Sequence, residues 1–207
     1  MPMIYLTRHG ETEWNIENRL QGWKNSPLTA KGQLNAEKLG QHLQDIPFQA
    51  VYSSPSERAL QTETAQLICD GRTAPIQTDA RLKEIHMGEW EGKTHDFLKQ
   101  NDLEAYTAFW ETPHLYVSKT GESFDVLKNR LLEFLKVIQV KHREETVLIV
   151  THGIAIKVLL SHFKGTAMEH LWTSSFIHGT SLTIVESTDQ GDVVLLEGDM
   201  THAKQEA

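Results

Sequence analysis

Two stretches of the sequence end in the same short pattern, in which an apolar run is followed by threonine, histidine and glycine. The first reads Thr7-Arg8-His9-Gly10 and the second reads Thr151-His152-Gly153. In open α/β sheets, ligands bind at the carboxyl ends of the strands. We therefore expect His9 and His152 to meet over one ligand, with the glycine after each histidine letting the backbone come close to it.

A phosphoryl group suits two histidines and an arginine. Arg8 offers a planar fork of donors that matches phosphate oxygens. A neutral imidazole nitrogen can attack phosphorus and form a covalent intermediate, while an acceptor on its other nitrogen fixes the tautomer. A second, protonated histidine can bind the transferred group. Taken alone, either histidine could instead be a satisfied core or surface residue.

The residues around His9 identify a family. The string Arg8-His9-Gly10-Glu11-Thr12-Glu13-Trp14-Asn15 resembles the signature of the histidine phosphatase (phosphoglycerate mutase-like) family. Five further segments resemble the family's motifs in the family's order: Asn18–Trp23, Leu28–Gly32, Ser53–Thr62, Leu82–Gly92 and Val150–Gly153. The resemblance covers the chain from Ile4 to about Leu160, and six motifs in order are far more specific than any one of them.

The resemblance implies a role for each matching residue. His9 would accept the phosphoryl group, and Arg8, Arg58 and His152 would bind its oxygens. The remaining matching positions would bind substrate or phosphate: Asn15 and Gln21 by their side chains, Gly22 and Gly153 by their backbone. Each has a plainer alternative, because Arg58 could be a solvated surface residue, Asn15 could cap a turn, and Gln21 and Gly22 could be ordinary loop residues.

Glu84 resembles the family's proton donor. Cleavage of an ester needs a proton for the leaving oxygen and then a base that activates water, and one carboxyl group can serve both steps. A free glutamate has a pKa of about 4.3, so acid function requires burial or a nearby phosphate charge to raise it. The alternative is an exposed glutamate paired with Lys83 or Arg81. Three rival carboxylates lie nearby in the sequence: Glu11, Glu89 and Glu91.

Composition and motifs also indicate which binding partners and cofactors to expect. The chain contains no His-Glu-x-x-His motif, no cysteine pair, no P-loop and no G-x-G-x-x-G. Two arginines beside His9, His152 and Glu84 would repel a cation, so we expect neither metal nor other cofactor. A formal charge of -8 disfavours nucleic acid and anionic membranes. The expected partner is a small phosphate monoester, and a homodimer is possible.

The same features bear on location. No apolar run approaches the roughly 20 residues of a membrane span, and the N-terminus lacks the pattern of a secretion signal. Cys69 is the single cysteine, which is compatible with a reducing compartment. We expect a cytoplasmic protein.

The spacing of apolar residues predicts the strands and helices that position these site residues. Strands are expected at 3–7, 49–53, 75–78, 146–151, 182–186 and 193–197. Helices are expected after Thr29, from Pro55 to about Gly71, from about Glu122 to His142 and from Gly153 to Phe163. This alternation predicts an α/β fold whose central sheet is mostly parallel and flanked by helices on both faces. We expect one domain over 1–207, with a helical, lid-like insertion at about 94–122.

The sequence favours a phosphatase over the family's other activities. Mutases of the family typically read Leu-Asn-Glu-Arg-His-Tyr-Gly at the acidic motif, whereas Ile85 and Met87 stand here, and residues 95–122 carry only Lys99 and Lys119 as fixed cations. The motif resembles that of small broad-specificity phosphatases and α-ribazole phosphatases. The aromatic lid favours apolar or aromatic phosphate monoesters, although its apolar residues could equally be ordinary helical core. The prediction is a metal-independent phosphomonoesterase that acts through phosphohistidine at His9. The alternatives are a cofactor-dependent phosphoglycerate mutase, an α-ribazole-type or sugar-phosphate-specific phosphatase, and a non-catalytic phospho-ligand binder.

Overall fold

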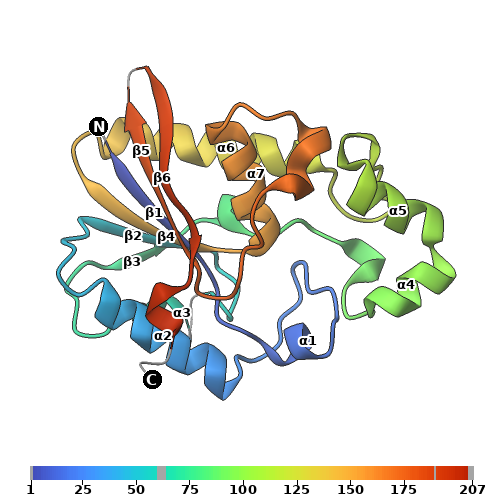
Figure 1. Cartoon of the computed structure of the whole chain (residues 1–207), viewed down its shortest axis with the longest axis horizontal. Coiled ribbons are helices and arrows are strands. Elements are labelled where there is room, and N and C mark those ends of the chain that lie inside the picture. The colour runs from blue at the N-terminus through green and yellow to red at the C-terminus, as the bar shows by residue number, and fades with distance from the viewer. Residues whose placement is uncertain (1, 60–63, 189, 205–207) are drawn as a thin grey trace.

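A computed structural model describes residues 2–59, 64–188 and 190–204 and contains a central sheet (Figure 1). Within these residues the sheet has six strands in the order β3-β2-β4-β1-β5-β6. Their bounds are β1 (Met3–Arg8), β2 (Ala50–Ser53), β3 (Ile76–Thr78), β4 (Thr146–Thr151), β5 (Leu182–Thr188) and β6 (Gly191–Asp199). The first four strands are parallel to one another, and β5 and β6 extend the sheet antiparallel. The expected α/β fold with a mostly parallel sheet is confirmed.

Helices cover both faces of this sheet. α6 (Phe124–Lys141) and α7 (Gly153–Phe163) lie on one face, and α2 (Ala30–His42) and α3 (Thr64–Ile68) lie on the other (Figure 1). The side chains of β4 alternate between the two layers: Val147 and Ile149 pack with α6 and α7, whereas Leu148 and Val150 pack with α2 and α3. A strand covered on both sides explains why this segment reads as a continuous apolar run.

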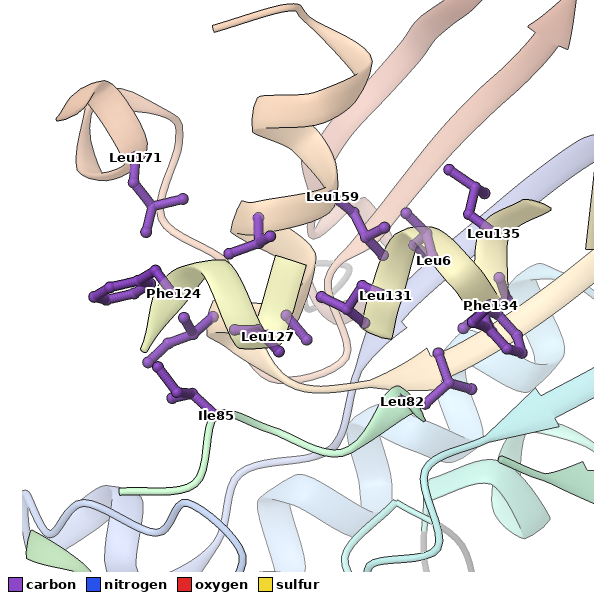
Figure 2. Packing of buried hydrophobic residues seen from close by; sticks show 14 of the residues in the cluster. Leu6, Leu82, Ile85, Phe124, Leu127, Leu131, Phe134, Leu135, Leu159 and Leu171 are labelled. Carbon is purple, nitrogen blue, oxygen red and sulfur yellow. The ribbon is translucent and has the colours of Figure 1, made fainter. Parts of the chain in front are cut away.

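The larger core lies between α6 and the sheet. Apolar side chains recur every three or four residues along α6, which places them on one face of the helix. Figure 2 shows Leu127, Leu131 and Phe134 from this face beside Leu6 of β1 and Leu159 of α7. The helix begins at the expected position, because the Ser123 side chain accepts a hydrogen bond from the Val126 N–H and caps its first turn.

The lid-like segment consists of short helices that lie to one side of the sheet. α4 (His95–Asn101) and α5 (Leu103–Glu111) are followed by a single 3-10 turn at Pro113–Leu115 (Figure 1). Phe109 packs against Phe124 and Trp172, with ring centroids 4.9 and 5.8 Å apart. The segment therefore shares the apolar core of α6, and its function as a lid stays a prediction.

One expected helix differs. Residues 55–59 form turns, and the helix expected from Pro55 to about Gly71 is present as α3, Thr64–Ile68; residues 60–63 lie outside the described part of the chain. The turns are tied to α3 by hydrogen bonds from the Thr64 hydroxyl to the Arg58 carbonyl and from the Ala65 N–H to the Ala59 carbonyl. Arg58 thus lies in a turn rather than in a helix.

None of the described helices combines the length and the apolar character needed to cross a bilayer.

Candidate active site

The two histidines follow neighbouring strands. β1 and β4 are adjacent and parallel, and their register pairs Arg8 with Thr151, so His9 and His152 leave the sheet at the same edge. Their ring centroids lie 5.2 Å apart with the ring planes at 62°. The structure therefore brings together the two histidines that the sequence placed at one ligand site.

The guanidinium of Arg58 lies between the two rings and is 1% exposed. Its Nε donates to Nε2 of His9 at 3.2 Å, and its Nη2 lies 3.1 Å from Nδ1 of His152. Further hydrogen bonds go to the carbonyls of Lys24 and Gly22, at 2.7 Å each. Because a guanidinium only donates, both imidazole nitrogens that face it must be unprotonated acceptors.

His9 is held as a neutral ring whose unprotonated nitrogen faces Arg58. Its Nδ1 lies 2.8 Å from the carbonyl oxygen of Gly10, so Nδ1 carries the proton and Nε2 carries the lone pair. Burial, followed by the charges of Arg58 and Arg8, lowers the pKa of His9 well below its usual range. The ring is therefore unprotonated at Nε2 near neutral pH, as a nucleophile requires.

Contacts at both ring nitrogens also fix the orientation of His152. Its Nδ1 faces Arg58, and its Nε2 lies 2.8 Å from the hydroxyl of Ser54, with the hydroxyl of Ser56 at 3.3 Å. Burial and then the charge of Arg58 lower the pKa of His152 well below the ordinary value. This ring is neutral before an anion binds, rather than protonated from the start. Ser54 and Ser56 were not predicted as site residues, although both lie in the motif that contains Arg58.

Glu84 lies at the N-terminus of α7 and is buried. Its carboxylate accepts hydrogen bonds from the backbone N–H groups of Ile154 at 3.0 Å, Ala155 at 3.1 Å and Ile85 at 3.0 Å. Burial raises the pKa of Glu84 and outweighs these hydrogen bonds and the charges of Arg58 and Arg8, which act in the opposite direction. Burial thus makes Glu84 easier to protonate than an exposed glutamate, which is the direction that an acid needs.

The alternatives for Glu84 do not match the structure. Arg81 forms its ion pair with Asp79 at 2.6 Å, and the Lys83 ammonium lies 4.2 Å from the ring centroid of Trp23. Among the rival carboxylates, Glu11 pairs with Lys31, Glu89 is exposed, and Glu91 accepts backbone N–H groups from Trp23, Lys24 and Met87.

Arg8 reaches the site from the end of β1. Its Nη1 donates to the carbonyl of Ile177 at 2.8 Å, whereas its Nε is buried and has no hydrogen-bond partner among the described residues. Arg8 also lines the cleft described below. A buried donor without a partner is rare in folded proteins, and an anion in the cleft would supply one.

Two residues of the expected substrate site, Asn15 and Gln21, form hydrogen bonds with Thr12. Asn15 caps the short helix α1 (Glu13–Ile16) by accepting from the Thr12 N–H at 3.1 Å, and Gln21 donates to the Thr12 hydroxyl at 2.7 Å. Gly22 has φ +52°, and a Cβ there would lie 2.3 Å from Glu91. Asn15, Gln21 and Gly22 all line the cleft, so Asn15 both caps a turn and faces the ligand site.

The two glycines that follow the histidines differ in their surroundings. A Cβ on Gly10 would lie 2.7 Å from the carbonyl oxygen of Gly32 in α2, so tight backbone packing requires a glycine there. A Cβ on Gly153 would lie at an ordinary 3.5 Å from Nε of Arg8. The expectation that both glycines serve close approach to a ligand is therefore corrected for Gly10, whose neighbour is a helix.

Arg8, His9, Arg58 and Glu84 line a cleft of about 680 Å³. We call these four residues the phosphoryl pocket, together with His152, which contacts Arg58 from behind the cleft lining. We call His95, Trp110 and Trp172, which also line the cleft, the lid wall. The rings of Trp110 and Trp172 lie 4.5 Å apart, and His95 lies 5.6 Å from Trp110.

Several cleft residues were not predicted from the sequence. Lys157, Trp172 and Phe176 line the cleft, but the sequence analysis gave them no role. A lysine inside the otherwise apolar stretch Gly153–Leu160 was a usable signal for Lys157. Trp172 and Phe176 carried none, because they lie in a 3-10 helix (Met168–Thr173) and in the irregular segment after it.

Among residues 2–59, 64–188 and 190–204, no group of three or more histidine, cysteine, aspartate or glutamate side chains is placed to hold an ion.

A sequence profile described as "Histidine phosphatase superfamily (branch 1)" matches residues 4–199. The adenosylcobalamin/alpha-ribazole phosphatase of Escherichia coli K12 is 31% identical over 169 residues, which are 82% of each chain. A probable phosphoglycerate mutase of Serratia proteamaculans is 31% identical and covers 98% of this chain and 95% of its own. The solved structure of Bacillus stearothermophilus YhfR is similar with a TM-score of 0.95 and 48% identity, covering 99% of this chain and 100% of that one.

Proposed function

The chain belongs to branch 1 of the histidine phosphatase superfamily, and from this premise we propose that it hydrolyses phosphate monoesters through a phosphohistidine intermediate on His9. One observation carries the proposal: His9 is fixed between the Gly10 carbonyl and the Arg58 guanidinium as a neutral ring whose Nε2 lone pair lies beside two arginines.

In the first step, Nε2 of His9 attacks phosphorus and the P–O bond to the leaving alcohol breaks. The charges of Arg8 and Arg58 stabilise the phosphoryl oxygens, which is the largest contribution expected in phosphoryl transfer. Nε of Arg8 has no partner among the described residues and can donate directly, whereas Arg58, including the N–H that faces Nε2 of His9, must first leave a present acceptor. The carboxyl group of Glu84 gives its proton to the leaving oxygen. Approach of a phosphate dianion raises the pKa of Glu84 further, so substrate binding helps to protonate the acid.

In the second step, water attacks the phosphohistidine, Glu84 takes the proton from this water, and the P–N bond breaks to release inorganic phosphate. One carboxyl group thus acts as acid and then as base. The Gly10 carbonyl holds the Nδ1 proton of His9 throughout, so the same nitrogen is available for the next turnover. No metal is needed in either step.

The lid wall supports an apolar or aromatic alcohol group in the substrate. Trp110 and Trp172 present indole rings to the cleft, and Phe176 lines it from a neighbouring segment. Concave apolar walls with few polar groups bind the organic part of a ligand by burying its surface. We place the chain with the broad-specificity phosphatases on this basis, and α-ribazole phosphate and sugar phosphates belong in the same substrate screen.

A mutase reaction needs firm binding of a second strongly anionic group. Among the described residues, the cleft contains two cations outside the phosphoryl pocket, Arg19 and Lys157. Arg19 is occupied by Glu17 and by the Gly92 carbonyl, and Lys157 is occupied by Ser174 and Ser175. This pairing favours hydrolysis over phosphoglycerate mutase activity. A purely binding function is disfavoured because the nucleophile, both arginines and the acid are all in place.

The test compares wild type and His9→Ala on p-nitrophenyl phosphate, with and without EDTA. We expect wild-type turnover that EDTA leaves unchanged and that the variant loses. Full activity of His9→Ala would overturn the proposal. Formation of 2-phosphoglycerate from 3-phosphoglycerate with a bisphosphoglycerate primer would favour the mutase instead. The homodimer and the cytoplasmic location stay predictions from the sequence.

A further inference from the structure

Lys157 is a buried cation in an apolar helix. It lies on α7, is 9% exposed and lines the cleft. Its ammonium donates to the Ser174 carbonyl at 3.1 Å, the Ser174 hydroxyl at 3.0 Å and the Ser175 carbonyl at 3.1 Å. These three neutral acceptors use all three of its hydrogens. The charge of Glu197 and the Trp172 ring, whose centroid lies 5.9 Å from the ammonium, offset part of the cost of burying this cation. An apolar residue would avoid that cost altogether, so the position calls for an explanation.

The segment that Lys157 holds has no regular structure. Residues 174–178 belong to no helix or strand, so no repeating backbone ladder fixes their path. Other hydrogen bonds near this segment run from the Ser174 hydroxyl to the Leu171 carbonyl at 3.3 Å, from the Ser175 N–H to Glu197 at 3.1 Å and from the Ser181 N–H to the His178 carbonyl at 3.1 Å. The Thr180 N–H donates to the Arg8 carbonyl at 3.0 Å, and the Ile177 side chain packs in a cluster with Ile156 and Leu160. Lys157 therefore supplies most of the hydrogen bonds at the start of this segment.

The segment also carries the partner of a phosphoryl-pocket residue. The carbonyl of Ile177 accepts the hydrogen bond from Nη1 of Arg8, which is the single side-chain hydrogen bond that Arg8 makes to the described residues. The direction of the Arg8 guanidinium thus depends on where Ile177 lies. Ile177 lies three positions after Ser174 and two after Ser175, whose carbonyls accept from Lys157.

We propose that Lys157 is a positioning residue, which holds the segment Ser174–Ile177 so that the Ile177 carbonyl aims Arg8 at the phosphoryl group. This inference rests on the proposed function, because it assigns Lys157 a role in the same site. Direct binding of an anionic substituent of the substrate would instead require Lys157 to release all three acceptors. The two roles differ in which substrates suffer when the ammonium is removed.

Lys157→Met keeps the length of the side chain and removes its charge and donors. We expect kcat/KM for p-nitrophenyl phosphate to fall by about tenfold to a hundredfold, since a misplacement of about 1 Å can cost roughly a hundredfold. Competitive inhibition by orthovanadate should weaken as well. Lys157→Arg, which keeps charge and donors, should recover part of the loss, and Lys136→Met, the same change at an exposed position of α6, should behave as wild type.

A double variant tests whether Lys157 acts through Arg8. In an Arg8→Met background, Lys157→Met should lower kcat/KM by less than about twofold, because residues that act through one another are not additive. If the losses in kcat/KM of the two single variants multiplied in the double variant, the proposal would be overturned. Wild-type kinetics of Lys157→Met, or a loss confined to substrates that carry a second anionic group, would overturn it as well.

Two further measurements keep the test decisive. If Lys157→Met does not fold, Ser174→Ala removes one of the three acceptors and should show a smaller loss in the same direction; unchanged kinetics there would contradict the proposal. If wild type hydrolyses no phosphate ester, the proposed function fails. Calorimetric binding of inorganic phosphate to wild type and Lys157→Met would then still decide the positioning role, with equal affinities refuting it.

Discussion

Arg58 of the phosphoryl pocket and Trp110 of the lid wall both line the cleft, but they are held in opposite ways. Arg58 is nearly fully buried and donates hydrogen bonds to His9 and to the carbonyls of Lys24 and Gly22. Trp110 is held by ring packing against Trp172 and Phe109, and its indole N–H has no hydrogen-bond partner among the described residues. Dense hydrogen bonding fixes one geometry, whereas ring packing tolerates different shapes. The contrast suggests that the pocket sets the reaction and the wall sets the range of substrates.

The largest expected effect is in the pocket. Glu84→Gln keeps the shape of the side chain and removes its acid, so kcat for alkyl phosphates should fall about 10²- to 10⁴-fold. The loss should be smaller for p-nitrophenyl phosphate, whose leaving group needs less protonation. Steady-state assays on both esters measure the difference. Glu89→Gln, at an exposed position in the same motif, is the matched control and should keep full activity.

A change in the lid wall should alter selectivity rather than chemistry. Trp110→Ala should lower kcat/KM about tenfold for aromatic phosphates and much less for small aliphatic ones, because it removes apolar contact with the alcohol group. Competition between two esters in one reaction gives the ratio directly. Phe97→Ala changes an exposed aromatic residue of α4 that does not line the cleft and should leave the ratio unchanged. Equal losses on both esters would erase the distinction between the two regions.

The buried histidines of the pocket should make stability depend on pH. The folded-state pKa of His152 is lowered, whereas an unfolded histidine has a pKa of about 6.5. The unfolded chain therefore binds more protons below about pH 6.5, and the contribution of this group to stability is lost as the pH falls from 7 to 5. The raised pKa of Glu84 acts in the opposite sense, so the informative quantity is a difference between variants.

His152→Asn should flatten this dependence by roughly 1 kcal/mol per pH unit below pH 6.5. Denaturant unfolding of wild type and variant at pH 7 and pH 5 measures the change. An equal change in the free energy of unfolding between pH 7 and pH 5 in both proteins would show that His152 is charged in the folded protein. It would remove the argument for neutral rings around Arg58.

The smallest effect is expected at Gly153. An added Cβ there makes an ordinary contact with Arg8, so Gly153→Ala should change kcat/KM by less than about twofold. Gly22→Ala is the contrasting variant, because Gly22 has a positive φ and its Cβ would strike Glu91. A severe loss in Gly153→Ala would show that its backbone approaches the ligand more closely than the free site indicates.

Local sequence patterns were sufficient to predict the sheet and the proximity of His9 and His152. The apolar runs before His9 and His152 predicted two strands, and parallel neighbours end at the same edge, which placed both rings together. The helix at Phe124–Lys141 was predicted from its spacing because one face of it is buried. Such features are encoded within a few consecutive residues.

The parts that could not be predicted depend on contacts between distant segments. Ser-Pro at positions 54 and 55 indicated a helix start, but hydrogen bonds from Thr64 and Ala65 hold residues 55–59 in turns. The requirement for glycine at position 10 comes from the backbone of Gly32 in α2. The stacking of Trp110 on Trp172 likewise joins two segments with no shared pattern.

The central claim is that Nε2 of His9 carries the phosphoryl group during turnover. The most direct measurement mixes enzyme with p-nitrophenyl phosphate, quenches it in alkali within the first turnover, and locates the phosphoryl group by peptide mass spectrometry. The account predicts a phosphoryl group on His9 that disappears as substrate is exhausted. An unmodified His9 peptide throughout an active time course, or a phosphoryl group on another residue, would contradict it.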